Sequence, residues 1–402
     1  MKKKSFVNHL YERVCGRSHS TLIGLKTYKR WQNLAIDSSC DLERVNSSAL
    51  NCIDTECISG RYLLSGYNEG LITIHDLAEI LYRKGGKLKT ARLIANSPGL
   101  HVERSHTKSV TGVHWYPHDT GMFTSSSMDA YLFVWDTQQM RVAEKLSFSP
   151  SRHKRTSYIL SHSISHSCMV AMGGSPPEIS IWSIKTGTVT HVLKAHQHRV
   201  NAVEWSPVCS ELLVSTGDGG KVFLWDIRQP KEYVWEFDYL NRTDSPFVKD
   251  RRAHACLAVP MLKFLACGSR FITCGVDGEI SVWNALKGVK EQQVFALAKS
   301  SSDFCKQLTL TPYMNNTQII YVPSSASIAG FDVNTGQKIT SLQGHYNRVN
   351  VCQAHYNEEL LYSGGIDGEM LFWKPREDIV VSAKRIPIAD NVDDWSDSDI
   401  DS

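Results

Sequence analysis

One position recurs along the whole chain: a residue at the end of an apolar run, most often Trp and in places followed by Asp. Trp135-Asp136 and Trp225-Asp226 are its clearest copies. The copies lie about 42 to 60 residues apart, and they are His75, Trp135, Trp182, Trp225, Trp283, Phe331 and Trp373. Self-similarity at such a period is typical of repeat proteins. The sequence therefore predicts seven copies of one structural unit.

Each unit contains two predicted hairpins. Residues 131–135 and 221–225 form apolar runs that follow a tight turn, and residues 110–115 and 200–205 begin the other hairpin of their units. Four strands in roughly 40 to 45 residues are typical of a WD40 blade. One blade cannot bury both of its faces, so its neighbours have to cover them. We expect an all-β fold, a seven-bladed WD40 β-propeller.

Three domains follow from this interpretation, namely a helix-loop-helix at residues 1–40, the propeller at 41–376 and a disordered acidic tail at 377–402. The ring needs one more strand than its last unit supplies, because Pro375 follows Trp373 almost at once and blocks further pairing. The segment Asp41–Val45 is expected to donate that strand. Closure of this kind removes the free edges of the sheets.

A His, a Ser or Thr, an Asp and a Trp recur in fixed register in three units. These sets are His106, Ser125, Asp129 and Trp135; His254, Thr273, Asp277 and Trp283; and His345, Ser363, Asp367 and Trp373. They imitate a catalytic triad, but an enzyme needs one such site and these recur. We interpret them as structural hydrogen-bond networks.

Three units depart from the network pattern. In the unit of Trp225, Asp218 lies seven residues before the Trp instead of six, so that network is expected to be incomplete. The units of Trp182 and Phe331 lack the Asp and are expected to be the least regular blades.

The N-terminal region carries two apolar stretches with helical spacing. Phe6, Leu10 and Val14 lie on one face of the first stretch, which Ser5 can cap and Gly16 can end. The second runs from Leu22 to Leu34 and includes basic residues. Two alternatives stay open for these helices: packing against the propeller's own flank, or insertion into a partner's groove.

Composition excludes several classes of protein. Net charge is only +3, with basic residues concentrated before residue 31 and acidic residues after 390, so the ring is nearly neutral. This argues against a sequence-specific nucleic-acid binder, although basic clusters exist at 152–155 and 251–252. No apolar run is long enough to span a membrane, and no secretory leader is apparent. We expect an intracellular chain with reduced cysteines.

The acidic C-terminal segment is too polar to fold alone. Ser396 and Ser398 lie among Asp residues, a setting that acid-directed kinases favour, so both are candidate phosphorylation sites. A tail that only increases solubility is the alternative.

Motifs for enzymatic chemistry are missing from the sequence. No phosphate-binding loop and no nucleophile elbow occurs, and His162, His166 and Cys168 lack a fourth ligand at a recognisable spacing. We therefore expect no catalytic residues, no metal and no cofactor. A propeller hydrolase is a third interpretation, beside a receptor and a generic scaffold, and it would need acidic or His side chains that converge on the central channel.

The tetrapeptide Trp225-Asp226-Ile227-Arg228 resembles the WDxR box of propellers that serve as substrate receptors of cullin-RING ubiquitin ligases. The resemblance implies that Arg228 faces the ligase adaptor. An Arg suits this role because its planar guanidinium can pair with several acceptors.

The stretch Trp115–Ser127, Gly344-His345-Tyr346 and the acidic end around Trp395-Ser396 are similar to the Cockayne syndrome A family of WD40 proteins. The resemblance implies a nuclear, non-catalytic substrate receptor of a cullin-4 RING ubiquitin ligase in transcription-coupled nucleotide excision repair. The adaptor would be the large subunit of the damaged-DNA-binding protein, beside cullin-4 and the RING subunit. Adaptor-binding residues would be Phe6, Leu10, Val14, Trp225, Asp226 and Arg228.

The opposite face would hold the Cockayne syndrome B ATPase beside stalled RNA polymerase II. The alternative is a generic WD40 scaffold in a chromatin or signalling complex without a ligase partner.

Overall fold

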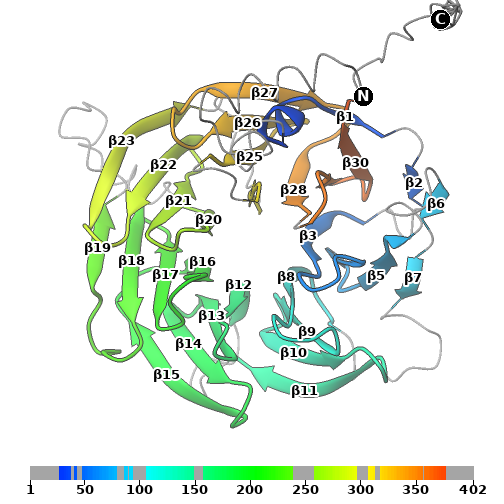
Figure 1. Ribbon diagram of the computed structural model, residues 1–402. Helices are drawn as coiled ribbons and strands as arrows, with labels where there is room; N and C mark the ends of the chain where they lie inside the picture. The colour runs from blue at the N-terminus through cyan, green and yellow to red at the C-terminus, as the bar shows by residue number, and fades with distance from the viewer. Residues whose placement is uncertain are drawn as a thin grey trace, which may run out of the picture.

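The computed structural model describes residues 27–37, 40–42, 48–78, 86–88, 90–93, 106–148, 157–238, 258–296, 307–312, 317–355 and 357–376. Within these residues, seven four-stranded antiparallel sheets surround a central axis (Figure 1). The predicted all-β, seven-bladed propeller is confirmed. The predicted helix 6–14 and the acidic tail lie outside the described residues.

The first six blades take their strands in chain order from the axis outward. Blade one comprises β3 (Leu50–Thr55), β4 (Tyr62–Tyr67), β5 (Ile72–Asp76) and β7 (Thr90–Leu93). Blade two comprises β8 (Val110–Trp115), β9 (Met122–Ser127), β10 (Tyr131–Asp136) and β11 (Arg141–Ser147). Blade three comprises β12 (Tyr158–Ile164), β13 (Met169–Ser175), β14 (Glu178–Ser183) and β15 (Thr188–Lys194).

The other blades repeat this order. Blade four comprises β16 (Val200–Trp205), β17 (Leu212–Gly217), β18 (Lys221–Asp226) and β19 (Trp235–Asp238). Blade five comprises β20 (Met261–Phe264), β21 (Arg270–Cys274), β22 (Glu279–Asn284) and β23 (Val289–Ala296). Blade six comprises β24 (Thr309–Leu310), β25 (Ile319–Ser324), β26 (Ser327–Asp332) and β27 (Lys338–Gln343). Blade seven comprises β28 (Val349–Ala354), β29 (Leu361–Gly365), β30 (Met370–Pro375) and, from the N-terminal region, β1 (Leu34–Ile36).

An N-terminal strand closes the ring, but the predicted segment Asp41–Val45 is wrong. β1 pairs with β30, and Leu34 lies opposite Pro375. The missing N–H of Pro375 does not block this pairing, because the N–H of Arg376 donates to the carbonyl of Asn33 at 2.8 Å. The closing strand thus lies before the predicted boundary at residue 41. Part of the predicted segment belongs to β2 (Cys40–Leu42), which pairs in parallel with β6 (Gly86–Leu88) in a separate two-stranded sheet.

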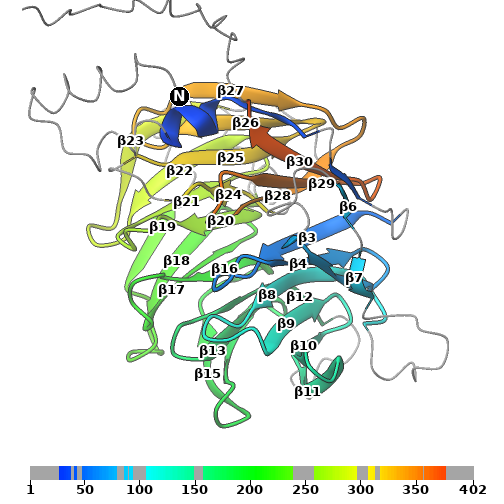
Figure 2. The same ribbon diagram turned by 45° about the vertical axis from the view of Figure 1, so that its right-hand side comes forward.

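Residues 27–32 are helical and lie against blades six and seven (Figures 1 and 2). Trp31 is 2% exposed and packs beside Leu34 and Tyr321 in one apolar cluster. The Tyr321 hydroxyl donates to the Trp31 carbonyl, and the Tyr28 hydroxyl donates to Asp332. For these residues the structure favours packing against the propeller's own flank.

The hydrophobic core lies between the blades. Val110 and Val113 of blade two pack with Cys52 and Leu64 of blade one in a single cluster. Gly66 is required at this contact, because a Cβ atom there would lie 2.5 Å from the sulfur of Cys52. Neighbouring blades therefore supply the second wall, as the repeat pattern predicts.

Polar side chains of the inner strands also link consecutive blades. Asp54 accepts the main-chain N–H of Trp115 at 2.9 Å, and Glu204 accepts that of Phe264 at 2.8 Å. Two further links of this kind join Ser163 to Trp205 and Thr309 to Ala354. Each satisfies a backbone donor at the edge of an inner strand.

We predict that Trp31→Ala lowers the free energy of unfolding by about 3 to 5 kcal/mol, because it leaves a cavity beneath the closing strand. Urea unfolding of the full chain measures this change. Lys29→Ala is the matched control, since Lys29 is exposed in the same helical segment. An equal loss in both variants would contradict the role given to Trp31.

Candidate functional site

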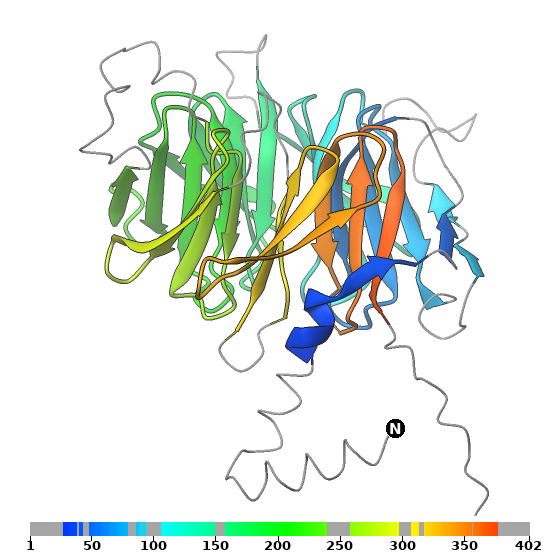
Figure 3. The ribbon, with the colours of Figure 1, turned by 90° about the horizontal axis from the view of Figure 1, so that it is seen from above.

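Strand direction sorts the loops of the ring onto two faces. In every blade the third strand ends on the face where the loop between the first two strands lies, because neighbouring strands are antiparallel. We call this the Arg228 face, after the turn that follows β18, and the other the opposite face. Figure 3 shows the ring from the side, with the helical segment 27–32 at one of these faces.

The helical segment lies on the Arg228 face. Leu34 pairs with Pro375 at the end of the third strand of blade seven, so the residues before β1 continue beyond that strand end. Tyr28 contacts Asp332 at the end of the third strand of blade six. Arg30 pairs with Glu359 in the loop between the first two strands of blade seven. Residue 27, where the described chain begins, therefore lies at this face.

Three residues of the WDxR box have different structural roles. Trp225 is buried, and its indole N–H donates to the Ser215 hydroxyl at 2.8 Å. Asp226 accepts two bonds from the Arg228 guanidinium, from Nε at 2.9 Å and from Nη2 at 2.6 Å. These bonds lower the pKa of Asp226 despite its partial burial. The Arg228 side chain remains 67% exposed, so its guanidinium is held in place and still open to solvent.

Other predicted site residues lie outside the described residues. These are Phe6, Leu10, Val14, His254, Ser396 and Ser398. Their roles remain predictions.

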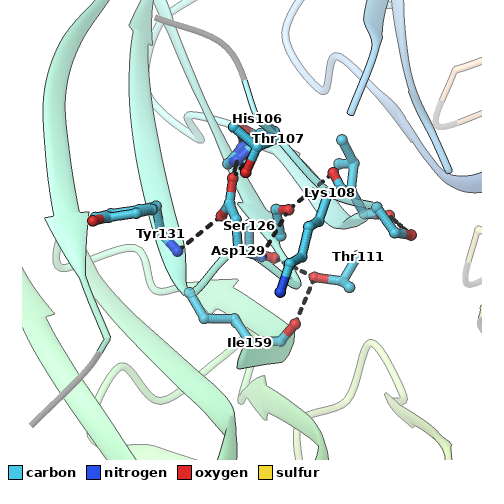
Figure 4. Close-up of polar contacts among 12 residues, drawn as sticks. His106, Thr107, Lys108, Thr111, Ser126, Asp129, Tyr131 and Ile159 are labelled. Carbon is cyan, nitrogen blue, oxygen red and sulfur yellow. Dashed lines mark hydrogen bonds and ion pairs between the residues drawn. The ribbon is translucent and has the colours of Figure 1, made fainter. Parts of the chain in front are cut away.

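In blade two all four predicted network residues are linked, and Figure 4 shows the part around His106 and Asp129. His106 contacts Asp129 through Nδ1 at 3.0 Å and Ser125 through Nε2 at 2.7 Å, and Trp135 donates to the same Ser125 hydroxyl at 2.8 Å. Burial alone would raise the pKa of Asp129, but its bonds from His106 and from two main-chain N–H groups outweigh burial and lower that pKa. The network joins the loop before blade two to the third strand of that blade.

Other blades form parts of this network. In blade four His196 contacts Ser215 at 2.8 Å, while Asp218 pairs instead with Arg199 at 2.6 Å and with Asn201 at 2.9 Å. Asp218, which lies one residue out of register in the sequence, therefore bonds to side chains other than His196.

In blade seven His345 and Trp373 both contact the Ser363 hydroxyl, at 2.7 and 2.8 Å. Asp367 accepts the main-chain N–H of Glu369, and His345 Nδ1 has no hydrogen-bond partner among the described residues. This network is smaller than its sequence register suggests. In blade five the described bond joins Trp283 to Thr273 at 2.8 Å.

One spacing explains which tryptophans are satisfied. Each bonded indole donates to a Ser or Thr ten residues earlier, as Trp225 does to Ser215. Met172 occupies that place for Trp182, whose Nε1 has no partner among the described residues. The recurring interval of ten residues is visible in the sequence, but the hydrogen bond that it marks became apparent only in the structure.

A cavity of about 600 Å³ lies along the central channel, between the inner strands of the blades. Asp54, His114, Glu204 and Lys263 line it, so acidic and His side chains do reach the channel. The rival hydrolase interpretation required such residues. Their described bonds run to the next blade, since Asp54 and Glu204 each accept a main-chain N–H there. Sequence reasoning missed these residues, although each directly precedes the last residue of its inner strand.

His162, His166 and Cys168 do not act together in the described part of the chain. His162 is buried, and its two ring nitrogens contact Thr124 and Ser126 at 2.9 and 2.8 Å. No group of three metal-binding side chains converges among the described residues. None of the helical segments that the structure describes has the length and apolar character of a membrane span.

Burial keeps several ring histidines neutral. It lowers the pKa to about 4 for four of them, His75, His114, His196 and His345. In the unfolded chain a His titrates near pH 6.5. The folded chain therefore binds fewer protons than the unfolded chain between pH 4 and 6.5. Asp54 and Glu204 act in the opposite direction, because burial raises the pKa of both carboxyl groups, that of Asp54 to about 7.

We predict that stability is lost as the pH falls from 6.5 to 4, because the buried His75, His196 and His345 outnumber the two carboxylates. Each of these three histidines contributes on the order of 3 kcal/mol across this window. His196→Gln should make the loss smaller, whereas His198→Gln should not, since His198 is exposed. Urea midpoints between pH 4 and 8 measure the effect. A pH profile of His196→Gln equal to that of the parent chain would refute the assignment.

Comparisons with known proteins agree with this geometry. The family model "WD domain, G-beta repeat" matches residues 99–136, 187–226 and 336–374. The WD repeat-containing protein ATCSA-1 of Arabidopsis thaliana is 24% identical over 92% of this chain and 95% of its own length. The GATOR2 complex protein Wdr59 of Drosophila melanogaster is 26% identical over 32% of this chain and 13% of its own. The Periodic tryptophan protein 2 of Arabidopsis thaliana is 27% identical over 46% of this chain and 18% of its own.

The first of these relatives spans nearly the whole chain, whereas the other two match a part of it. The chain is thus a seven-bladed β-propeller with WD40 repeats, and it is similar along nearly its whole length to the ATCSA-1 protein.

Proposed function

We propose that this chain is the non-catalytic substrate receptor of a cullin-4 RING ubiquitin ligase that acts in transcription-coupled nucleotide excision repair in the nucleus. The Arg228 face binds the adaptor, the large subunit of the damaged-DNA-binding protein, which connects it to cullin-4 and the RING subunit. The opposite face binds the Cockayne syndrome B ATPase and the stalled RNA polymerase II complex.

The observation that carries this proposal is that Arg228, exposed and held in one orientation, lies on the same face of the ring as the helical segment 27–32. Asp226 holds the guanidinium, and the buried Trp225 anchors the strand end that carries both residues. An Arg fixed in this way loses little conformational entropy when it binds acceptors of a partner. Similarity to ATCSA-1 along 92% of the chain supports the same assignment.

Apolar side chains near Arg228 support a protein partner on this face. Val208 and Leu286 are each 70% exposed, in a loop of blade four and a turn of blade five. Val208 lies next to Gly268 of blade five, where an added Cβ would approach its side chain to 2.8 Å. The exposed side chains therefore span the junction of the two blades. An Arg beside apolar residues is typical of the buried centre of an interface.

The opposite face offers a different surface for the client. Tyr346 follows His345 in the connection between blades six and seven, and it is 95% exposed. Exposed aromatic residues of this kind frequently anchor interfaces. A receptor with separate faces for adaptor and client brings the two together and raises their effective concentration. Ubiquitin transfer itself takes place elsewhere in the assembly.

We predict that Arg228→Ala combined with Leu10→Asp abolishes co-purification of the adaptor while the ring stays folded. Arg228→Ala alone should weaken adaptor binding about tenfold or more, because it removes an interface Arg without altering the core. Pull-down and calorimetry with the purified adaptor measure both effects.

Arg141→Ala is the matched control, since Arg141 is exposed at the start of β11, directly after the equivalent turn of blade two on the same face. Adaptor binding that survives the double substitution would refute the proposal. Recovery of chromatin or signalling complexes without the adaptor, from cells exposed to ultraviolet light, would favour the generic scaffold.

A further inference from the structure

Polar side chains from several blades lie at one level of the central channel. Asp54, His114, Glu204 and Lys263 come from blades one, two, four and five, and each directly precedes the last residue of its inner strand. Ser163 and Gln353 occupy the corresponding places in blades three and seven. All six line the cavity of about 600 Å³. Cavities of this size hold small ligands or single side chains.

The charges at this level do not balance. Lys263 and Arg199 are the cations that line the cavity within the described residues. Lys263 pairs with Glu204 at 2.9 Å, and Arg199 pairs with Asp218 at 2.6 Å. Among the described residues, Asp54 is then the carboxylate of the cavity that has no Lys or Arg at ion-pair distance. Its side chain is 14% exposed, so water compensates its charge only in part.

Asp54 is thus a carboxylate in an environment that disfavours its charge. Burial raises its pKa to about 7, although the main-chain N–H groups of Trp115 and Thr55 and the charge of Lys263 act against the rise. A cationic ligand would remove this cost, because a nearby opposite charge favours the ionised form.

His114 adds a second acceptor. Burial lowers its pKa to about 4, so the ring is neutral and one of its nitrogens accepts hydrogen bonds. Nδ1 of His114 lies 3.9 Å from Oδ2 of Asp54. This gap is too long for a hydrogen bond between the two groups, and a donor placed between them could serve both.

We propose that the central channel binds a monovalent organic cation, an alkylammonium or guanidinium group, whose N–H donors are accepted by Asp54 and His114, while Glu204 adds negative charge to the same cavity. The group is carried either by a Lys or Arg side chain of a partner or by a free amine. An anionic ligand fits less well, because it would have to displace Glu204 from Lys263 beside the charge of Asp54. This site is independent of the proposed ligase role, since Arg228 takes no part in it.

Isothermal titration calorimetry of the full chain at pH 8 tests the proposal. The probes are propylguanidinium and butylammonium, with the neutral isostere propylurea and the anion butyrate as controls. Both cations should bind, and propylurea and butyrate should not. A capped Gly-Arg-Gly peptide that binds more tightly than propylguanidinium assigns the group to a partner protein. Weaker binding of the peptide assigns it to a free amine.

Two substitutions in the channel should act in opposite directions. Asp54→Asn keeps the acceptor for Trp115 but removes the charge, and it should weaken cation binding about tenfold. Lys263→Gln should strengthen binding, because Glu204 loses its paired cation. Asp119→Asn should have no effect, since Asp119 is an exposed carboxylate outside the cavity. Equal binding of propylurea and propylguanidinium, or unchanged binding in both channel variants, would overturn the proposal.

Discussion

Every blade depends on its neighbours to cover its faces, and the rest of the structure follows from this constraint. Clusters such as that of Cys52 and Val110 draw their residues from two blades, so no blade has a complete core of its own. The same dependence makes closure essential, because an open ring would leave one blade uncovered and a strand edge unpaired. β1 pairs with β30, and Trp31 anchors the segment that leads into β1. The N-terminal segment is therefore part of the ring and of the Arg228 face at once.

The repeated polar networks serve rigidity rather than chemistry. Each fixes a Trp near the end of a third strand through a Ser or Thr hydroxyl, and in blade two a His and an Asp extend the bond to a loop. Blade four has the same bond close to Arg228. The indole of Trp225, three residues before Arg228, donates to the Ser215 hydroxyl. The bond from a Trp indole to a Ser or Thr hydroxyl is common to several blades. In blade four it also fixes the strand end that carries the candidate docking residue Arg228.

Much of the fold could be predicted because its signals are local and repeated. The Trp positions identify the blades, and Asp218, one residue out of register, indicates the altered network of blade four. The closing strand could not be read in this way, because the choice between 34–36 and 41–45 depends on tertiary contacts of Trp31 and on a main-chain bond past Pro375. The polar side chains that line the central channel could not be predicted for a similar reason. Asp54 and His114 belong to different blades, and only the ring brings their side chains to 3.9 Å.

Asp54 connects the architecture of the ring with the chemistry of its channel. Its bond to Trp115 joins blades one and two, and this bond requires an acceptor but not a negative charge. Ser163 makes the equivalent bond to Trp205 with a hydroxyl, which shows that a neutral side chain is sufficient for the link. A carboxylate at this place carries a desolvation cost that a neutral acceptor would avoid. Because the link between blades does not account for the charge, the charge points to a ligand.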